Sequence, residues 1–370
     1  MGKLKKGLVV SLVATTLLAG CGASADDKKE TSQSIDLNSL SLSDIEKKAK
    51  AEGKVESVGM PDTWANWGET WGNIDKKYGV KHADTDMSSA EEIALFESEK
   101  KKATKDIGDV GQSFGPIAES KGVTLPYKTS YWDEVPDWAK DDNGDWVIGY
   151  TGTISFMTNT AKVKDAPKSF ADILKGDYKV TIGDVNAGSQ SQNAVLAAAI
   201  ANGGDESNLE PGLAFFAKLA EQGRLDMGEA SLARLEAGEI AVGIFWDFNA
   251  LNYKNAIEKG NAKTDFAVSI PTDGSVQSGY ATIINAYAPH PYAAALTREY
   301  ILSDEGQINL ARGFARPIRN KVKLPADVKA KLLDDAEYKK ARPIKDTKAW
   351  DAAATTLGKQ WQEEVLTKAK

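Results

Sequence analysis

Short apolar runs rich in β-branched residues alternate along the chain with longer stretches in which apolar residues recur every three or four positions. The first pattern predicts buried strands and the second predicts amphipathic helices. Strands are therefore expected at 55–60, 107–110, 145–150 with a continuation at 154–157, 178–183, 240–246, 266–270 and 281–287. Helices are expected at 63–77, 168–174, 192–202, 211–222, 229–237, 249–259 and through the remainder to residue 370. This alternation predicts an α/β fold with mostly parallel sheets.

The first 20 residues follow a different pattern. Lys3, Lys5 and Lys6 stand before an uncharged and mostly apolar run at 7–19. A cationic start, an apolar stretch of this length and small residues after it predict a secretory signal peptide, because the stretch is short for a transmembrane helix. The protein is therefore expected to work outside the cytoplasm, on the cell membrane or on the periplasmic side in a double-membrane cell.

The signal peptide ends in Leu-Ala-Gly-Cys at 18–21, where the only cysteine of the chain stands. This tetrapeptide resembles the bacterial lipobox, and the resemblance implies removal of residues 1–20 and attachment of diacylglycerol to the sulfur of Cys21. Two or three acyl chains would hold the protein stably at a membrane. The alternative is a short membrane anchor with an incidental cysteine. Residues 21–43 are polar without apolar periodicity, which predicts a flexible tether behind the lipid.

The composition argues against several classes of function. Lysine and arginine number 46 against 53 aspartates and glutamates, a net charge of −7, so nucleic-acid binding through phosphate contacts is not expected. One cysteine and two histidines leave no disulfide framework and no cysteine-rich zinc site. The sequence also lacks the glycine-rich loops that hold ATP or NAD phosphates. We therefore expect no cofactor and no metal.

Four phrases in the chain together resemble one known family. They stand at 146–153 (Trp-Val-Ile-Gly-Tyr-Thr-Gly-Thr), 166–174 (Ala-Pro-Lys-Ser-Phe-Ala-Asp-Ile-Leu), 238–247 (Gly-Glu-Ile-Ala-Val-Gly-Ile-Phe-Trp-Asp) and 313–318 (Gly-Phe-Ala-Arg-Pro-Ile). With their order and the lipobox, the chain resembles the bacterial extracellular solute-binding proteins of ABC importers, in the branch that holds iron, thiamine, polyamine and phosphonate binders. The likeness extends over 53–365.

The resemblance implies a two-lobed periplasmic-binding-protein-like fold of type II, in which hinge strands join two α/β lobes and closure traps a ligand between them. We place the crossings near 150–158 and 281–287. Residues 44–150 together with 282–370 would then form lobe 1, and residues 151–281 would form lobe 2. Open α/β sheets bind ligands outside the carboxyl ends of their strands, so the candidate ligand contacts are residues that follow strands.

Tryptophans and a carboxylate follow the first expected strand. They are Asp62, Trp64 and Trp67, and a tryptophan beside an aspartate suits an amine through cation–π attraction and ion pairing. The alternative for the tryptophans is a buried core stripe, and for Asp62 it is a helix N-cap. Ser113 follows the next expected strand among small residues, which allow a ligand to approach the backbone closely.

Later strand ends add further candidates. Tyr150 and Thr151 stand at the first crossing, and Tyr280 precedes the second. Ser189 and Ser191 stand at the start of an expected helix, where free N–H groups and hydroxyls form a cradle for an anion. Ordinary serine capping is the alternative for both serines.

Trp246 and Asp247 again place an indole beside a carboxylate, where the family resemblance implies ligand contacts; Asp247 could instead be an N-cap. Carboxylates, indoles and helix-start amides together suit a compact amine, polyamine-like or aminophosphonate-like. We therefore predict a monomeric lipoprotein of an ABC transporter, not an enzyme, that captures such a solute and delivers it to a membrane permease. The expected partners are the solute, the permease and, through the lipid on Cys21, the membrane, without nucleic acid.

Three other functions stay open. A ferric-iron receptor of the same fold is the nearest, although iron binders of the family typically carry adjacent tyrosines and Tyr280, Tyr287 and Tyr292 are scattered. A secreted hydrolase has carboxylates enough for a glycosidase pair, but the chain lacks a His-Glu-x-x-His motif and has no usable cysteine nucleophile. A surface adhesin or structural lipoprotein would show no stabilisation by a small ligand, unlike a receptor.

Overall fold

The computed structural model of the chain describes residues 35–186, 188–260 and 264–369. The predicted signal peptide, the predicted lipidation site Cys21 and most of the predicted tether lie outside the described residues. Within the described part, no helix has the length and apolar character that a membrane crossing requires.

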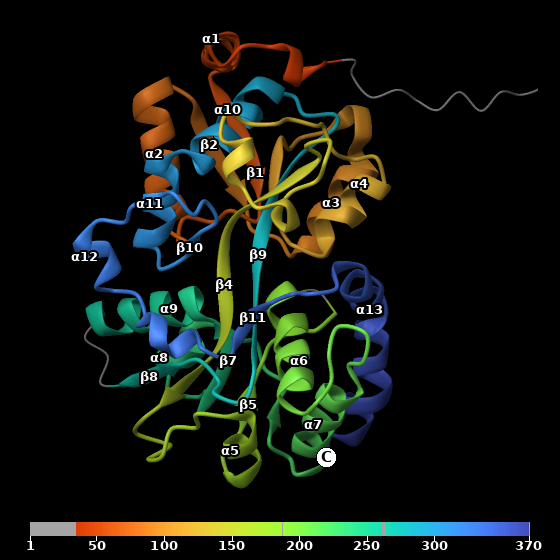
Figure 1. Cartoon of the computed structure of the whole chain (residues 1–370), viewed down its shortest axis with the longest axis vertical. Helices are drawn as coiled ribbons and strands as arrows, with labels where there is room; N and C mark the ends of the chain where they lie inside the picture. The colour runs from red at the N-terminus through yellow and green to blue at the C-terminus, as the bar shows by residue number, and fades with distance from the viewer. Residues whose placement is uncertain (1–34, 187, 261–263, 370) are drawn as a thin grey trace, which may run out of the picture. The chain divides into compact units, whose positions relative to one another are not determined.

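One long strand belongs to two sheets. Strand β4 (Trp146–Asn159) is buried along its whole length, with its first half paired antiparallel to β9 (Ser275–Ile284) and its second half paired antiparallel to β7 (Val242–Trp246). Figure 1 shows β4 and β9 side by side, with one group of elements at each of their ends. These two groups are the lobes of a two-lobed α/β fold.

Each lobe is built around one of the two sheets. In the first sheet β1 (Lys54–Val58) lies parallel to β2 (Lys81–Thr85) and to β3 (Ile107–Gly111), and β3 pairs antiparallel with β9. In the second sheet β7 lies parallel to β5 (Val180–Thr181), which lies parallel to β6 (Leu225–Asp226), and β8 (Phe266–Ser269) pairs antiparallel with β4. The short strands β10 (Arg316–Pro317) and β11 (Ala341–Pro343) pair with β4 and β9.

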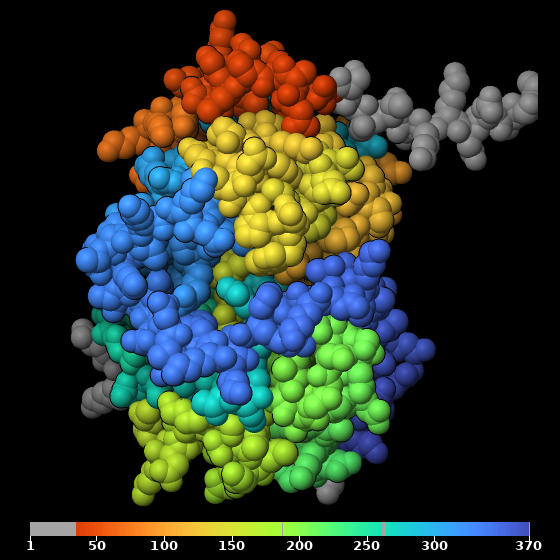
Figure 2. All heavy atoms as spheres, viewed as in Figure 1, coloured from red at the N-terminus to blue at the C-terminus, as the bar shows by residue number. Residues whose placement is uncertain are grey.

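Helices cover both sheets. Around the first lie α1 (Leu42–Glu52), α2 (Trp67–Tyr78), α3 (Ser89–Glu99), α4 (Phe114–Ser120), α10 (Pro291–Leu302) and α11 (Asp304–Arg312). Around the second lie α5 (Phe170–Lys175), α6 (Ser189–Ala201), α7 (Glu210–Glu221), α8 (Leu232–Glu236), α9 (Asp247–Lys259) and α13 (Thr347–Gln360). The short helix α12 (Ala326–Lys329) belongs to the segment between β10 and β11. Figure 2 shows that this segment, in blue, lies across the junction of the two lobes on one face.

The elements expected from the sequence are largely present, with three differences. The sheets are mixed rather than mostly parallel, because the hinge strands β4 and β9 run antiparallel to each other, and also to β7 and β3 respectively. The helix expected from residue 63 begins only at Trp67, because Ala65 and Asn66 have left-handed backbone angles. Strands β2 and β6 and helices α1, α3 and α4 were not expected, and β10 and β11 interrupt the expected helical remainder.

The last helix packs on the second lobe. Trp361, which follows α13, contacts Phe216 of α7 with ring centroids 5.4 Å apart, so the C-terminus lies against α7 (Figure 1). The sequence prediction had placed all of 282–370 in lobe 1, and the chain instead returns to the other lobe at its end. The predicted lobe limits at 150/151 and 281/282 stay a prediction.

A half-buried carboxyl on α13 gives a stability test. Burial raises the pKa of Asp351 to about 6. Such a group stabilises the fold below its ordinary unfolded pKa, and this stability is lost as the pH rises through about 6. Asp351→Asn is therefore expected to raise the free energy of unfolding at about pH 8 by up to about 1 kcal/mol, since partial exposure screens the effect, and to change it little at about pH 4. Urea unfolding at both pH values checks this, and an equal effect at both would contradict it.

Candidate functional site

A cavity of about 260 Å³ lies at the junction of the two lobes. From the first lobe it is lined by the turns that follow β1 and β2, by α3 and by β3, and from the second lobe by the starts of α6 and α9. Tyr280 of the hinge strand β9 completes the wall. The cavity therefore stands at the carboxyl ends of strands, where ligand sites of open α/β sheets occur.

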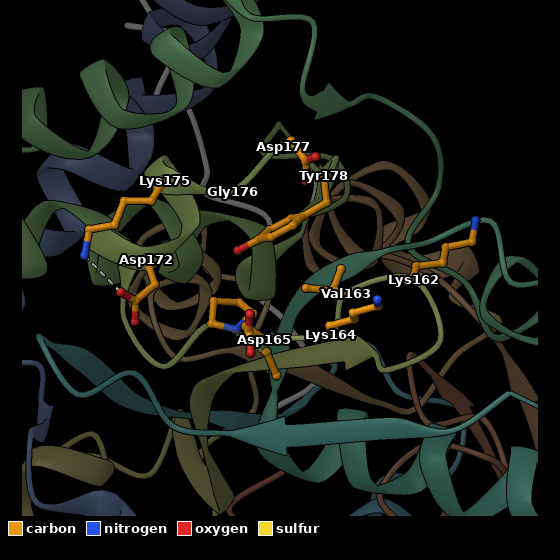
Figure 3. Close-up of a pocket in the computed structure, with 11 residues that line it drawn as sticks. Lys162, Val163, Lys164, Asp165, Asp172, Lys175, Gly176, Asp177 and Tyr178 are labelled. Carbon is orange, nitrogen blue, oxygen red and sulfur yellow. Dashed lines mark hydrogen bonds and ion pairs between the residues drawn. The ribbon is translucent and has the colours of Figure 1, made fainter.

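A wider hollow elsewhere has a different character. The side chains around it belong to a single stretch of the second lobe, 162–178, and enclose about 610 Å³ (Figure 3). Its charges are mixed, and Lys175 turns away to pair with Asp172 at 3.2 Å. Because one lobe alone forms this hollow, closure of the lobes would not enclose a ligand there. The smaller cavity is therefore the candidate site.

Two buried carboxyl groups form one wall of the cavity. Glu92 of α3 and Asp109 of β3 are 1% and 2% exposed. The backbone N–H of Asp109 donates to Oε2 of Glu92 at 3.0 Å. Gly59 and Gly108 flank the Glu92 carboxylate so closely that a Cβ on either would collide with it. Only glycine at these two positions leaves room for the acid, which is held in place by the surrounding backbone.

A hydroxyl connects this acidic wall to an aromatic one. Tyr150 Oη donates to Oδ2 of Asp109 at 2.6 Å and accepts from the indole N–H of Trp64 at 2.8 Å. The other oxygen of Asp109, Oδ1, is buried without a hydrogen-bond partner. Trp64 lines the cavity and meets Tyr280 edge to face at 5.5 Å between ring centroids. An indole and a carboxylate thus face the same space, which suits a cation.

In the described part of the chain, the ionisable side chains of the cavity wall include acids but no base. Burial and the neighbouring charge of Asp109 raise the pKa of Glu92 well above its ordinary value, and burial does the same for Asp109. Asp86 also lines the cavity, with part of its side chain exposed to solvent. Its partial burial and the charges of Asp84 and Glu91 raise its pKa. Of the described residues along the wall, none carries a positive charge. Buried carboxylates without a counter-charge are costly, so the cavity is suited to a ligand that brings positive charge.

The second lobe contributes neutral polar groups. Gly188 and Ser189 stand at the start of α6, and Asn249 of α9 lines the cavity while donating to Oε1 of Gln190 at 3.1 Å. Asn252 reaches across the junction and donates from Nδ2 to the carbonyl of Thr63 at 2.6 Å. This hydrogen bond joins the two lobes directly, so the lobes are closed on each other in this structure.

A close contact of the lobes gives a test of closure. A Cβ on Gly111, at the end of β3, would collide with the side chain of Ser189 in the other lobe. Gly111→Ala is therefore expected to hold the lobes apart and to weaken ligand binding about tenfold, roughly 1.4 kcal/mol, with little effect on the unfolding of the ligand-free protein. Calorimetric titration checks this. The matched control is Gly72→Ala on α2, where a Cβ meets nothing within 4 Å, and equal affinity of the two variants would contradict the closed geometry.

The bridging hydroxyl gives a second test. Tyr150→Phe removes the donor to Asp109 and the acceptor for the Trp64 indole. We expect ligand affinity to fall about tenfold, because a lost hydrogen bond to a charged group is worth roughly 1.5–3 kcal/mol and the charge of Asp109 remains. Titration calorimetry measures the change. Tyr287→Phe serves as the control, because the Tyr287 ring is partly exposed and does not line the cavity. An unchanged affinity of Tyr150→Phe would show that the bridging hydroxyl has no role in binding.

Three of the residues predicted from the sequence line the cavity: Trp64, Ser189 and Tyr280. Trp67, Tyr150 and Trp246 are fully buried behind them. Trp67 meets the Tyr150 ring edge to face at 6.0 Å, and Trp246 donates from Nε1 to Tyr280 Oη at 3.3 Å. These three rings therefore support the cavity wall rather than form it.

The other predicted residues lie away from the cavity wall. Asp62 is exposed on a turn, where its carbonyl accepts from the N–H of Gly68. Ser113 is buried at the start of α4 with its hydroxyl unpartnered. The Thr151 hydroxyl accepts from Gln277 at 3.2 Å, and the Ser191 hydroxyl donates to the carbonyl of Ile182 at 2.7 Å. Their predicted contacts with a ligand stay predictions.

Asp247 is held in a network of its own. Its Oδ1 accepts from the N–H of Thr153 at 2.8 Å, and its Oδ2 accepts from Oη of Tyr338 at 2.5 Å. The guanidinium of Arg316 lies 3.8 Å from the centre of the Tyr338 ring. Asp247 is 1% exposed and does not line the cavity, and its predicted contact with a ligand, paired with Trp246, stays a prediction.

Sequence reasoning missed eight polar residues of the wall: Thr63, Asp86, Ser88, Ser89, Glu92, Asp109, Asn249 and Tyr253. Asp109 was passed over because it stands inside a strand rather than after it, although a carboxylate in a buried strand is itself a signal. Glu92 belongs to the unexpected helix α3, which begins with a capping box formed by Ser88 and Glu91. That Ser-x-x-Glu pattern could have located the helix.

The comparisons with known proteins agree with this geometry. A model of a family described as bacterial extracellular solute-binding protein matches residues 102–351. The structure is similar to the periplasmic binding protein AfuA from Actinobacillus pleuropneumoniae with exogenous fructose-6-phosphate bound, with TM-score 0.70, 17% identity, and coverage of 85% of this chain and 99% of that one. It is also similar to iron-bound HitA from Pseudomonas aeruginosa, with TM-score 0.65, 16% identity, and coverage of 83% and 99%. Such identities show the shared fold alone. A search of curated protein sequences found no match.

Proposed function

The chain belongs to the bacterial extracellular solute-binding proteins, the solute-binding components of ABC transporters, and on this premise we propose that it captures a small amine-bearing solute and delivers it to a membrane permease. Family membership implies an extracytoplasmic location and binding rather than catalysis. The observation that carries the amine is the wall formed by Asp86, Glu92 and Asp109, beside which no described residue of the cavity carries a positive charge. An ammonium group would supply the missing counter-charge and would also face the Trp64 indole.

Two solute types fit this cavity. A polyamine would bring several positive charges to the three carboxyl groups, and an aminophosphonate would place its anion at the start of α6, where Gly188 and Ser189 line the cavity. The acidic wall is built from three side chains and the α6 end offers one hydroxyl and backbone groups. Charge balance therefore favours the polyamine-like solute.

Ferric ion is the second candidate, supported by the likeness to iron-bound HitA. Within the described residues, one group of acids and histidines has ligand atoms that all lie within 4.8 Å of one another, and it consists of Glu119, Asp141 and Asp145, outside the cavity. The hydroxyls of Tyr150 and Tyr280 are already hydrogen-bonded to Asp109 and Trp246. The cavity therefore favours an organic cation over a metal ion.

We further propose that the mature protein is held at the membrane by a lipid on Cys21. The support is the signal-like start of the chain and the lipobox-like sequence before this cysteine. Mass spectrometry of the protein from a bacterial membrane fraction tests it, and an intact N-terminus without acyl chains would contradict it.

Titration calorimetry tests the amine. The probes are spermidine, 2-aminoethylphosphonate, ferric citrate and fructose 6-phosphate. We expect heat from at least one amine, and a thermal shift that grows with its concentration, because a ligand at about 100 times Kd stabilises the folded state by roughly 2.7 kcal/mol. No heat from either amine at about millimolar concentration, which corresponds to a binding free energy of roughly −4 kcal/mol, would overturn the proposal.

A further inference from the structure

The carboxyl groups of Glu92 and Asp109 are held in fixed positions, and the surrounding backbone prevents the Glu92 carboxylate from moving away. The two side chains come from α3 and β3, and the Asp109 N–H donates to the Glu92 carboxylate at 3.0 Å. Gly59 and Gly108 pack against that carboxylate from two sides, so it cannot rotate away toward solvent. Oδ1 of Asp109 is buried without a partner. Two acids are thus fixed close together in a place that water reaches poorly.

The elements around the pair add acids. The strand β2 and the residues after it contribute Asp84 and Asp86, whose charges both raise the pKa of Glu92. The hydroxyls that face the cavity or the pair belong to Tyr150 of β4, Tyr253 of α9 and Tyr280 of β9. As phenols, these groups are neutral at physiological pH. None of them balances the negative charge of the two carboxylates.

The nearest bases do not balance it either. His82 of β2 stacks on Trp71, with ring centroids 3.7 Å apart, and its Nε2 hydrogen-bonds with the Ser57 hydroxyl at 2.8 Å. Burial, with a contribution from Lys105, lowers the pKa of His82 to about 4, so the ring is neutral at physiological pH. Lys105 itself lies 3.6 Å from Glu56. The pair therefore has no cationic neighbour among the described residues of the wall.

We infer that the empty cavity keeps one proton on the Glu92–Asp109 pair and that a cationic solute displaces this proton on binding. The inference rests on the proposed function. In the exchange the O–H bond of one carboxylic acid breaks and its proton passes to solvent, while an ammonium group takes its place as the counter-charge. No electron moves and no further reactant is needed. Burial raises the pKa of both acids, and the charge of Asp109 raises that of Glu92 further, so both effects act in this direction.

The exchange makes capture sensitive to pH. Where the pair holds a proton before binding and none after it, the association constant rises about tenfold for each pH unit. An acidic medium would therefore release the solute, and a neutral one would favour its capture. A receptor whose acids stay ionised when empty would show no such slope.

Calorimetry in two buffers measures how many protons are released when spermidine binds. Spermidine is titrated at about pH 7 in phosphate and in Tris, whose heats of ionisation differ, so the difference in observed heat gives the number of protons released. We expect close to one proton for each spermidine bound. Glu92→Gln should bring this number near zero. Glu97→Gln, on the exposed side of the same helix and paired with Lys121, should leave it unchanged.

The outcomes distinguish a failure of the proton exchange from a failure of the proposed amine-binding function. Binding of spermidine with equal heats in both buffers overturns the exchange and leaves the proposed function in place. Absence of binding by any amine overturns the proposed function and the exchange together. If Glu92→Gln does not fold, the wild-type affinity measured from about pH 5.5 to 8 decides alone, because a flat profile contradicts the exchange and a rising one supports it.

Discussion

Asp109→Asn is expected to weaken spermidine binding about 100-fold at about pH 8, a loss of roughly 2.7 kcal/mol. The substitution keeps the shape of the side chain and its contact with the Tyr150 hydroxyl but removes a fully desolvated charge from the cavity wall. At about pH 6 the expected loss is smaller, because the wild-type pair then holds its proton more firmly and contributes less charge. Titration calorimetry at the two pH values measures both losses.

The same substitution should stabilise the ligand-free protein. Burial raises the pKa of Asp109 well above its ordinary value, so this group stabilises the fold while protonated, and that stability is lost as the pH rises through its raised pKa. Asparagine carries no charge at any pH, and Asp109→Asn should therefore melt higher than the wild type at about pH 8. Asp133→Asn, at an exposed position of a short 3₁₀ helix (Trp132–Glu134), is the control. A variant that both melts lower and binds weakly would show a damaged fold instead of a lost ligand contact.

The alternation of apolar patterns was sufficient to predict the α/β class because most strands are buried and most helices amphipathic, whereas the two lobes were predicted from the family resemblance. It could not predict the pairing directions. Strand β4 pairs with β9 on one half and with β7 on the other, and this exchange of partners depends on contacts between segments about 100 residues apart, which no local pattern contains. The strands β10 and β11 are only two and three residues long, too short for any periodicity to appear.

The rule that ligands bind after strand ends located part of the candidate site. It found Trp64 and Ser189, which follow β1 and β5, whereas Tyr280 lines the cavity from within β9. Asp247 also follows a strand but does not line the cavity, and its carboxylate accepts a hydrogen bond from Tyr338, far along the chain. The rule could not find Glu92, which enters the cavity from the side of a helix and not from a strand end.

The largest stability effect in the chain is expected at Arg298, on α10. Its side chain is fully buried, and its five N–H groups are all occupied. They donate to the carbonyls of Tyr127, Gly144, Asp145 and Thr282 and to the Thr282 hydroxyl, at 2.8–3.3 Å. Burial lowers the pKa of the guanidinium to about 10, which still leaves it charged at physiological pH. One side chain thus ties α10 to β9 and to the loop that precedes β4.

Arg298→Met should lower the free energy of unfolding by about 3–5 kcal/mol, because the hydrophobic replacement fills the volume but removes the guanidinium donors from four buried carbonyls, of which Gly144 keeps the backbone N–H of Tyr127. Urea unfolding measures the loss. Arg312→Met on the neighbouring helix α11 is the control, since Arg312 is exposed and its ion pair with Glu69 lies at the surface, where such pairs contribute below about 1 kcal/mol. If Arg298→Met does not fold, Arg298→Lys should fold with an intermediate stability, because lysine keeps the charge with three donors instead of five. Equal losses for Arg298→Met and Arg312→Met would show that the buried network contributes no more than a surface pair.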